Sequence, residues 1–251
     1  MIKKAGNVKA LILAAGLGKR LRPLTDSIPK SLIRFGNKES IVHILEKLRD
    51  ADINNIGINL HHLWKDLVRF FATTSELTDF SFYFSYEEHL LGTGGAIINC
   101  RDFLFDDDFI VINSDIYSEL DLKKLITFHD EKGSQLTLVF KPNRQPTDLK
   151  IDSAFHITEF AEKNFSPETS VQGGTFTGIS IWKKKIINKN LSSLNKGKYY
   201  EFSGDIILPL LREGLEICGY PHYDFWMDFG TPESLKRLQY HFKKKQGVKD
   251  V

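Results

Sequence analysis

Residues 8–32 read VKALILAAGLGKRLRPLTDSIPKSL, and this stretch carries the strongest indication of the fold and chemistry of the chain. Its first six residues are a short apolar run, which predicts a buried β-strand. Small residues and two glycines, Gly16 and Gly18, follow the strand. Glycine lets a backbone turn sharply and approach a ligand, and exposed N–H groups in such a turn bind anions. The cations that follow are Lys19, Arg20, Arg22 and Lys30. Because cations neutralise phosphate charge, the stretch predicts a phosphate-binding loop.

Two common phosphate motifs do not fit this loop. A dinucleotide-binding fingerprint requires a third glycine where this chain has Leu21. A P-loop requires Ser or Thr directly after Gly18-Lys19, and this chain has Arg20 there. The loop therefore belongs to another class of nucleotide or phosphate site.

The bulk composition excludes several kinds of partner. The chain has 251 residues, with 34 Lys and Arg against 32 Asp and Glu, so its formal charge of +2 indicates neither a nucleic-acid nor a membrane partner. No apolar run approaches the length of a membrane span. The two cysteines, Cys100 and Cys218, make no metal-ligand or disulfide pattern, and we therefore expect a reducing, cytoplasmic setting.

Apolar runs alternate with segments of helical periodicity through the first 140 residues. Strands are predicted at 8–13, 55–60, 80–84, 109–113 and 136–140, and helices at 41–48, 63–71, 95–103 and 122–129. This alternation predicts an α/β fold with an open, mixed, mainly parallel sheet flanked by helices. The later segments predict strands and turns at 148–160 and 173–182, a helix capped by Ser203, a strand at 215–220 and a final helix. Thr231 and Pro232 mark the start of that last helix.

A second candidate site follows the apolar run at 109–113, which continues as Asn113-Ser114-Asp115. Ligands of open α/β folds bind at the carboxyl ends of the strands, where this acidic residue is expected to lie. A carboxylate there suits Mg²⁺, a hard ion that prefers oxygen ligands and substrate phosphates.

The run GxGxRLxPLT, followed by Pro29-Lys30, resembles the signature of the sugar-1-phosphate nucleotidyltransferases, or nucleotide-sugar pyrophosphorylases. The resemblance extends from Val8 to about Leu238 and continues in the family's order. The later matching segments are LGTGGA (91–96), NSD (113–115), FAEK (160–163), GGTFTGI (173–179) and FWMDFGTPE (225–233). It implies a Rossmann-like, nucleotide-diphospho-sugar transferase fold. It also implies one domain over 1–251, with a nucleotide half to about 140 and a sugar half after it. We expect no C-terminal β-helix of the kind that many relatives carry, and a homo-oligomer stays open.

The resemblance assigns roles to residues of this chain. Catalytic roles fall to Arg20, Lys30 and Asp115, and the metal ligands for Mg²⁺ are Asp115 and Asp228. The nucleotide would contact Ala14, Ala15, Gly16, Gly18, Gly92, Thr93, Gly94 and Gly95. The sugar would contact Asn113, Glu162, Lys163, Thr175, Thr177 and Gly178. The glycines of 92–95 are expected because a side chain would collide with the nucleotide. Glu87 and Glu88, just upstream, lie where the family often has acidic residues, and simple solvation stays open as their role.

Two departures from the family pattern leave the substrates open. Asn164 replaces the proline that usually follows the Glu-Lys pair, and Phe176 replaces a sugar-binding asparagine. The LGTGGA and NSD segments resemble guanylyltransferases that act on mannose 1-phosphate or heptose 1-phosphate. The TFTGIS segment resembles uridylyltransferases that act on N-acetylmuramate 1-phosphate.

The expected reaction joins an NTP to a sugar 1-phosphate, giving an NDP-sugar and pyrophosphate, with GTP and a mannose-like 1-phosphate as the favoured pair. Alternatives are a UTP-dependent enzyme for an amino-sugar 1-phosphate and a non-catalytic sensor of nucleotide sugars. A metal-dependent glycosyltransferase is disfavoured because the Asp-x-Asp motif usual in such enzymes is missing at Asn113-Ser114-Asp115.

Overall fold

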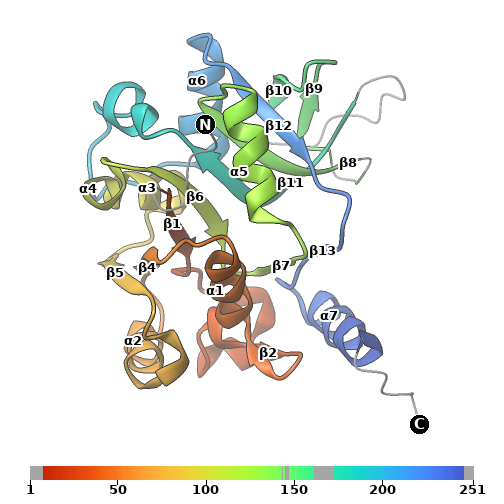
Figure 1. The fold of residues 1–251 in the computed structure, drawn as a ribbon. Coiled ribbons are helices and arrows are strands. Elements are labelled where there is room, and N and C mark those ends of the chain that lie inside the picture. The colour runs from red at the N-terminus through yellow and green to blue at the C-terminus, as the bar shows by residue number, and fades with distance from the viewer. Residues whose placement is uncertain (1–7, 143, 145–146, 161–171, 246–251) are drawn as a thin grey trace.

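The computed structural model describes residues 8–142, 144, 147–160 and 172–245 and is shown in Figure 1. Nine strands of this described part form one sheet. Its main path runs β12 (Ile217–Pro221), β8 (Leu136–Pro142), β11 (Gly173–Trp182), β6 (Asp108–Asn113), β1 (Val8–Leu13), β4 (Asn55–Leu60) and β5 (Ser81–Tyr86). The short strands β9 (Leu149–Ile151) and β10 (Ile157–Phe160) join the N-terminal end of β11.

The sheet is mixed, with parallel strands at its centre. β6, β1, β4 and β5 run parallel to one another, and β8 runs parallel to β12. The long strand β11 lies antiparallel to both β6 and β8 and so joins the two parallel parts. This arrangement confirms the α/β fold expected from the alternation of strands and helices.

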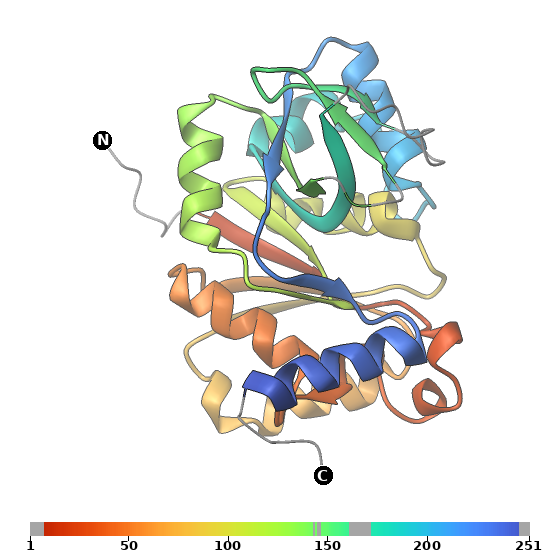
Figure 2. The same ribbon diagram turned by 90° about the vertical axis from the view of Figure 1, so that its right-hand side faces the viewer.

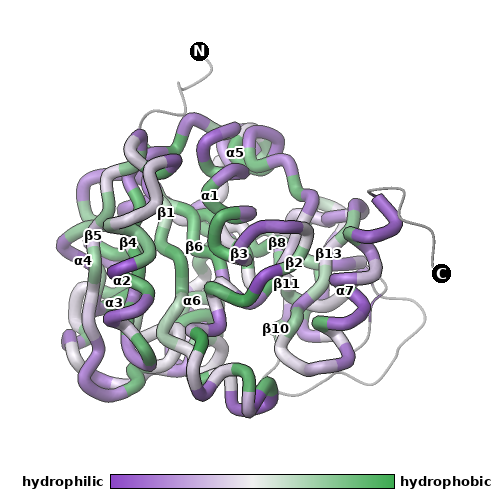
Figure 3. Tube along the Cα trace, turned by 90° about the horizontal axis from the view of Figure 1, so that it is seen from below, coloured by the Kyte–Doolittle hydropathy of each residue, from purple (hydrophilic) through white to green (hydrophobic). Residues whose placement is uncertain are grey.

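Helices cover both faces of the sheet. One face is covered by α1 (Ser40–Asp50), α2 (Trp64–Thr73) and α5 (Leu122–Glu131), and the other by α3 (Gly92–Asn99), α4 (Arg101–Leu104) and α6 (Leu208–Arg212). Alternation along β1 explains the two cores, because Ala10 and Ile12 enter one cluster and Leu11 enters the other. Figure 3 shows the hydrophobic residues concentrated on the central strands.

A third, smaller cluster holds the last helix, α7 (Pro232–Lys245), against the body of the molecule (Figure 2). Leu235 and Leu238 of α7 pack on Phe35, which lies in the hairpin of β2 (Arg34–Phe35) and β3 (Lys38–Glu39). The expected cap is confirmed, because Thr231 Oγ1 accepts a hydrogen bond of 3.2 Å from the backbone N–H of Ser234.

Three expectations about individual elements need correction. The helix expected at 95–103 is two helices, α3 and α4, separated at Cys100. The helix expected to be capped by Ser203 begins as a π-helical segment over Phe202–Ile207, so Ser203 lies inside it and caps nothing. Strand β5 continues to Tyr86, two residues beyond the expected end.

A small ribbon that sequence reasoning missed lies beside the main sheet. It pairs β7 (Ile116–Ser118) with β13 (Trp226–Asp228) in antiparallel register, with Ile116 opposite Asp228. These two short strands are about a hundred residues apart in the chain, which is why local patterns did not reveal their pairing. Across the described segments, no helix is both long and apolar enough to cross a membrane.

Candidate active site

An open cavity of about 330 Å³ lies at the carboxyl ends of the parallel strands β1, β4, β5 and β6. Its walls are formed by Leu13, Ala15, Gly16, Lys30, Asn59, Glu87, Leu90, Gly92, Thr93, Asn113, Ser114, Asp115 and Tyr199. Ligand pockets of small-molecule enzymes have volumes of this order, and open α/β sheets hold them at this edge. The cavity is therefore the candidate active site.

The glycine loop after β1 forms one wall. A Cβ added to Gly16 would meet no atom within 4 Å, so the backbone there is open toward the cavity. Gly18 has a φ of +61° and packs on Thr25, whose hydroxyl donates to the Gly18 carbonyl at 2.9 Å. Ala15 lines the cavity, whereas Ala14 is buried behind it. Thus Gly16 provides the open backbone and Gly18 provides the turn.

Lys30 and Asp115 meet inside the cavity. The Lys30 ammonium donates to Asp115 Oδ2 at 2.5 Å, although the two residues are 85 positions apart. The Lys30 side chain is 11% exposed and that of Asp115 is 30% exposed. A mostly buried ammonium needs a charged partner, and this carboxylate supplies one while keeping a face toward the cavity.

The β7–β13 ribbon brings Asp228 beside Asp115. Asp228 lies opposite Ile116, and the N–H of Phe229 donates to the Asp115 carbonyl at 3.0 Å. In the part of the chain that the structure describes, no group of three or more His, Cys, Asp and Glu side chains gathers that could hold a metal. Mg²⁺ takes one or two carboxylates together with substrate phosphates, so the pair Asp115 and Asp228 fits that ion.

Arg20 lies against the turn after Asp228. Its Nη2 lies 2.6 Å from the point where a Cβ on Gly230 would sit, and Asp228 Oδ1 lies 3.6 Å from the same point. Arg20 is exposed and lies outside the cavity walls, on the side where Asp228 is found. The first loop and the late turn therefore meet at Gly230, which has no side chain to separate them.

The glycine-rich segment 91–95 forms the opposite wall, and only part of it faces the cavity. Gly92 and Thr93 line the cavity, and Gly92 has a φ of +70°. A Cβ on Gly94 would lie 2.9 Å from the Tyr200 carbonyl oxygen, and one on Gly95 would lie 2.5 Å from that of Lys198. The latter two glycines therefore make room for a neighbouring chain segment. Glycine was expected at these two positions because a side chain would collide with the nucleotide. The structure shows that a side chain there would collide with the protein backbone instead.

The residues assigned to the sugar fall into three groups. Asn113 lines the cavity, and Gly178, with a φ of +80°, packs on its amide. Thr177 is buried and its hydroxyl donates to the Val139 carbonyl at 2.8 Å. Thr175, also buried, donates to the Arg144 carbonyl at 3.1 Å, and neither threonine lines the cavity. Glu162 and Lys163 lie outside the described residues.

Six residues of the cavity walls were not assigned to the site from the sequence: Leu13, Asn59, Glu87, Leu90, Ser114 and Tyr199. Solvation, the role left open for Glu87, does not apply, because this residue is 2% exposed, and burial raises its pKa. It follows β5 directly, as Asn59 lies at the end of β4. Extending the strand at 80–84 by two residues would have placed Glu87 at the same sheet edge as Asp115.

The chain is similar to known proteins along most of its length. Residues 9–245 match the family described as nucleotidyl transferase. The chain is 31% identical over 235 residues to the probable mannose-1-phosphate guanylyltransferase 1 of Oryza sativa subsp. japonica. It is 30% identical over 235 residues to mannose-1-phosphate guanylyltransferase 1 of Arabidopsis thaliana. Each alignment covers 90% of this chain and 62% of the relative, so the chain spans about three fifths of their length.

Solved structures share the fold. HddC from Yersinia pseudotuberculosis superposes with a TM-score of 0.76 at 27% identity, covering 94% of this chain and 99% of that chain. The same protein is also known in complex with GMP-PN, with a TM-score of 0.75 to this chain. An apo UDP-glucose pyrophosphorylase gives a TM-score of 0.80 at 18% identity, covering 95% of this chain and 98% of that chain, which shows the fold alone.

Proposed function

This chain belongs to the nucleotidyl transferase family, and on that premise we propose that it transfers a nucleotidyl group from a nucleoside triphosphate to a sugar 1-phosphate, releasing pyrophosphate. The observation that carries the proposal is the convergence, in one cavity, of the open backbone at Gly16 with the Lys30–Asp115 pair. Asp228 lies outside the cavity walls, and the β7–β13 ribbon brings its backbone close to that of Asp115. An open backbone turn, a mostly buried cation and two carboxylates are the groups that bind phosphates and a divalent cation.

In the proposed reaction, an oxygen of the sugar 1-phosphate attacks the α-phosphorus of the triphosphate. The bond from that phosphorus to the oxygen of the β-phosphate breaks, and pyrophosphate leaves. No enzyme nucleophile is required, so catalysis consists of positioning and charge neutralisation. The two reacting phosphates repel each other, and the Lys30 ammonium offsets that repulsion. Arg20 holds the leaving β- and γ-phosphates from its place beside Gly230.

Asp115 and Asp228 are proposed to hold Mg²⁺. When bound, the ion neutralises charge that develops on the α-phosphate oxygens. Before substrates bind, Lys30 keeps the Asp115 carboxylate in place through their 2.5 Å contact. An ammonium has three donors, so Lys30 has two left for phosphate oxygens without losing Asp115.

For the substrates, we propose GTP and a mannose-like 1-phosphate. The support is the name of the relatives at about 30% identity, mannose-1-phosphate guanylyltransferase, and the HddC complex with GMP-PN. Asn113, fixed by Gly178, is the proposed sugar contact within the described site, with Glu162 and Lys163 as further proposed contacts. Thr175 and Thr177 support the strand that carries Gly178, because their hydroxyl groups donate to backbone carbonyls.

Pyrophosphate release across four NTPs and a panel of sugar 1-phosphates, with Mg²⁺ and with EDTA, tests the proposal. We expect release for one nucleotide–sugar pair, abolished by EDTA. A UTP-dependent signal with an amino-sugar 1-phosphate would correct the substrates and keep the reaction. Nucleotide binding without release across the whole panel would favour a non-catalytic sensor.

A further inference from the structure

A buried polar pair, Asn59 and Glu87, connects the two opposite walls of the cavity. Asn59 Oδ1 accepts from the N–H of Ala14 at 2.7 Å, and Asn59 Nδ2 donates to Glu87 Oε1 at 2.8 Å. Glu87 Oε2 then accepts from the N–H of Leu91 at 3.1 Å. Ala14 precedes Gly16 in the glycine loop, and Leu91 precedes Gly92. We infer that Asn59 and Glu87 are positioning residues that set the spacing between these walls for the nucleotide.

The direction of each hydrogen bond is fixed by the backbone at both ends. The N–H groups of Ala14 and Leu91 can only donate, so each must face an acceptor. Asn59 therefore turns its carbonyl oxygen to Ala14 and its NH₂ group to Glu87. Glu87 receives donors on both of its oxygens, which requires a group that only accepts, as a carboxylate does.

Burial makes this chain of bonds difficult to break. Asn59 is 4% exposed and Glu87 is 2% exposed, so water does not readily replace a lost partner. A further contact of 2.8 Å between His61 Nδ1 and the Glu87 carbonyl holds the backbone at this point. The relay from Ala14 through Asn59 and Glu87 to Leu91 thus fixes the glycine loop relative to the glycine-rich segment through side chains rather than through the sheet.

The two walls are the parts of the cavity that a nucleotide would touch together. Ala15 and Gly16 lie on one side, and Gly92 and Thr93 on the other. A small shift of one wall against the other would misplace the phosphates relative to the nucleoside. The inference rests on the proposed function only in taking a nucleotide as the ligand.

Reversing the polarity of the central bond tests the relay. In Glu87→Gln, an amide replaces the carboxylate, and one of its two ends must oppose an N–H donor whichever way it turns. In Asn59→Asp, two carboxylates face each other. In the double variant Asn59→Asp/Glu87→Gln, the carboxylate introduced at position 59 accepts from the Ala14 N–H and from the NH₂ group of the amide introduced at position 87. The oxygen of that amide accepts from the Leu91 N–H. All hydrogen bonds are then restored with the central one reversed.

Calorimetric titration of the full chain with each of the four NTPs gives the readout, with the melting temperature measured in parallel. For the triphosphate that binds best, we expect each single variant to bind about 10-fold more weakly, the scale of one lost buried hydrogen bond. We expect the double variant to return to within about 3-fold of the wild-type affinity. Where turnover is detected, KM for the sugar 1-phosphate should change little.

Glu213→Gln is the matched control, because Glu213 accepts a hydrogen bond of 3.2 Å from Asn190 in an exposed pair. This substitution should leave the nucleotide affinity unchanged.

Three results would overturn the inference. Single variants that bind nucleotide as the wild type does would show that the relay positions nothing, even if their melting temperature falls. A double variant as weak as Glu87→Gln would show that the ligand needs the carboxylate itself. A wild-type chain that binds none of the four NTPs would remove the ligand and, with it, the proposed function. Nucleotide binding that follows the relay without pyrophosphate release would count against the proposed function alone.

Discussion

The contact between Lys30 and Asp115 is the residue-scale feature on which the proposed chemistry depends. It places a cation and a carboxylate 2.5 Å apart in the wall of an open cavity. The β7–β13 pairing brings the backbone of Asp228 close to that of Asp115. Each side chain therefore has a structural partner and a proposed ligand, and single substitutions separate the two roles.

Asp115→Asn should lower kcat by at least about 100-fold, because an amide is a poor ligand for a divalent cation and the negative charge is lost. The side chain keeps its size, so the circular dichroism spectrum should stay that of the wild type, whereas the melting temperature should fall because the mostly buried Lys30 ammonium loses its charged partner. Pyrophosphate release at saturating substrates is the measurement.

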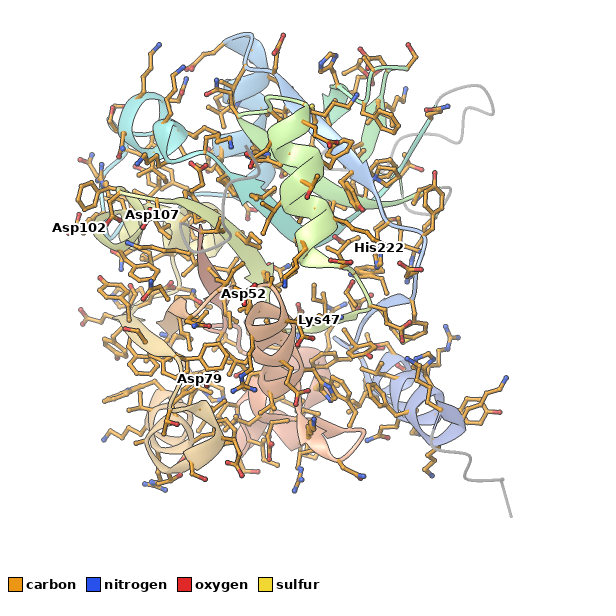
Figure 4. All side chains as sticks on the ribbon, in the orientation of Figure 1. Lys47, Asp52, Asp79, Asp102, Asp107 and His222 are labelled. Carbon is orange, nitrogen blue, oxygen red and sulfur yellow. The ribbon has the colours of Figure 1, made fainter. Side chains whose placement is uncertain are left out.

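Asp102→Asn is the matched control for that variant. Asp102 is 73% exposed at its side chain, pairs with Lys196, and lies at the edge of the molecule in Figure 4. Turnover of Asp115→Asn equal to that of the control would remove Asp115 from the mechanism.

Lys30→Ala should lower kcat/KM by about 100-fold, the scale of one lost donor to a developing anion. The Asp115 carboxylate left behind is partly exposed, so the loss of stability should be modest. Initial rates over both substrate concentrations give the measurement. Lys38→Ala is the control, since Lys38 makes a 2.5 Å ion pair with Glu46 outside the cavity. If kcat/KM of the two variants differs by less than roughly 3-fold, the scale of an exposed ion pair, the charge-neutralising role of Lys30 is rejected.

At the scale of elements, the segment 198–201 shapes the glycine-rich wall of the cavity. The Tyr200 N–H donates to the Leu91 carbonyl at 2.9 Å, and the Gly95 N–H donates to the Tyr200 carbonyl at 3.2 Å. The Tyr199 ring lies over Gly92, where a Cβ would come within 3.1 Å of it. The glycines let two loops from different halves of the chain pack at backbone distance, and α3 begins at that junction.

Comparing the stability of Gly92→Ala with that of Gly133→Ala isolates the contribution of this packing. Both glycines have positive φ, +70° and +61°, so an alanine suffers similar backbone strain at each. A Cβ on Gly92 would lie 2.6 Å from the Tyr200 carbonyl oxygen, whereas Gly133 has open space around it. Urea unfolding should show Gly92→Ala less stable than Gly133→Ala by about 1–3 kcal/mol. Equal stabilities would show that segment 198–201 moves aside at no cost.

At the scale of the whole molecule, the buried His222 and the partly buried His43 join the β7–β13 ribbon and α1 to the rest of the chain. His222, labelled in Figure 4, lies in the segment between β12 and β13. Its Nε2 contacts Ser118 Oγ at 2.9 Å and so connects that segment to β7. Burial lowers the pKa of His222, and nearby Lys141 lowers it further. Burial also lowers the pKa of His43, which stacks on Phe35 beside α7.

These lowered pKa values predict that stability falls in mild acid. The unfolded chain takes up protons near pH 6.5, while the folded chain resists until a lower pH. The free energy of unfolding should therefore decrease from about pH 7.5 to about pH 5.5. His222→Gln should reduce that decrease, by up to about 1.4 kcal/mol per pH unit. An unchanged slope in His222→Gln would refute the assignment.

The sequence alone determined the fold class and most of the parallel core. Apolar runs such as 8–13 and 109–113 bury both faces of a strand, and that requirement is local and visible in the residues. The glycine loop was predicted from turn chemistry, which is also a property of a short segment, whereas the roles of Lys30 and Asp115 were assigned through the family resemblance. The cap at Thr231 likewise involves only residues within one helical turn.

Only the tertiary structure decided which distant residues share the site. The Asp115–Asp228 proximity comes from the pairing of two three-residue strands, too short to leave a periodic signal. Glu87 and Asn59 lie in the cavity wall because parallel strands end at one edge, and their buried side chains bond to each other and to the two loops. Conversely, Thr175 and Thr177 do not line the cavity, because their hydroxyl groups donate to backbone carbonyls of neighbouring segments. Long-range packing sets these distances, and no local pattern of residues encodes them.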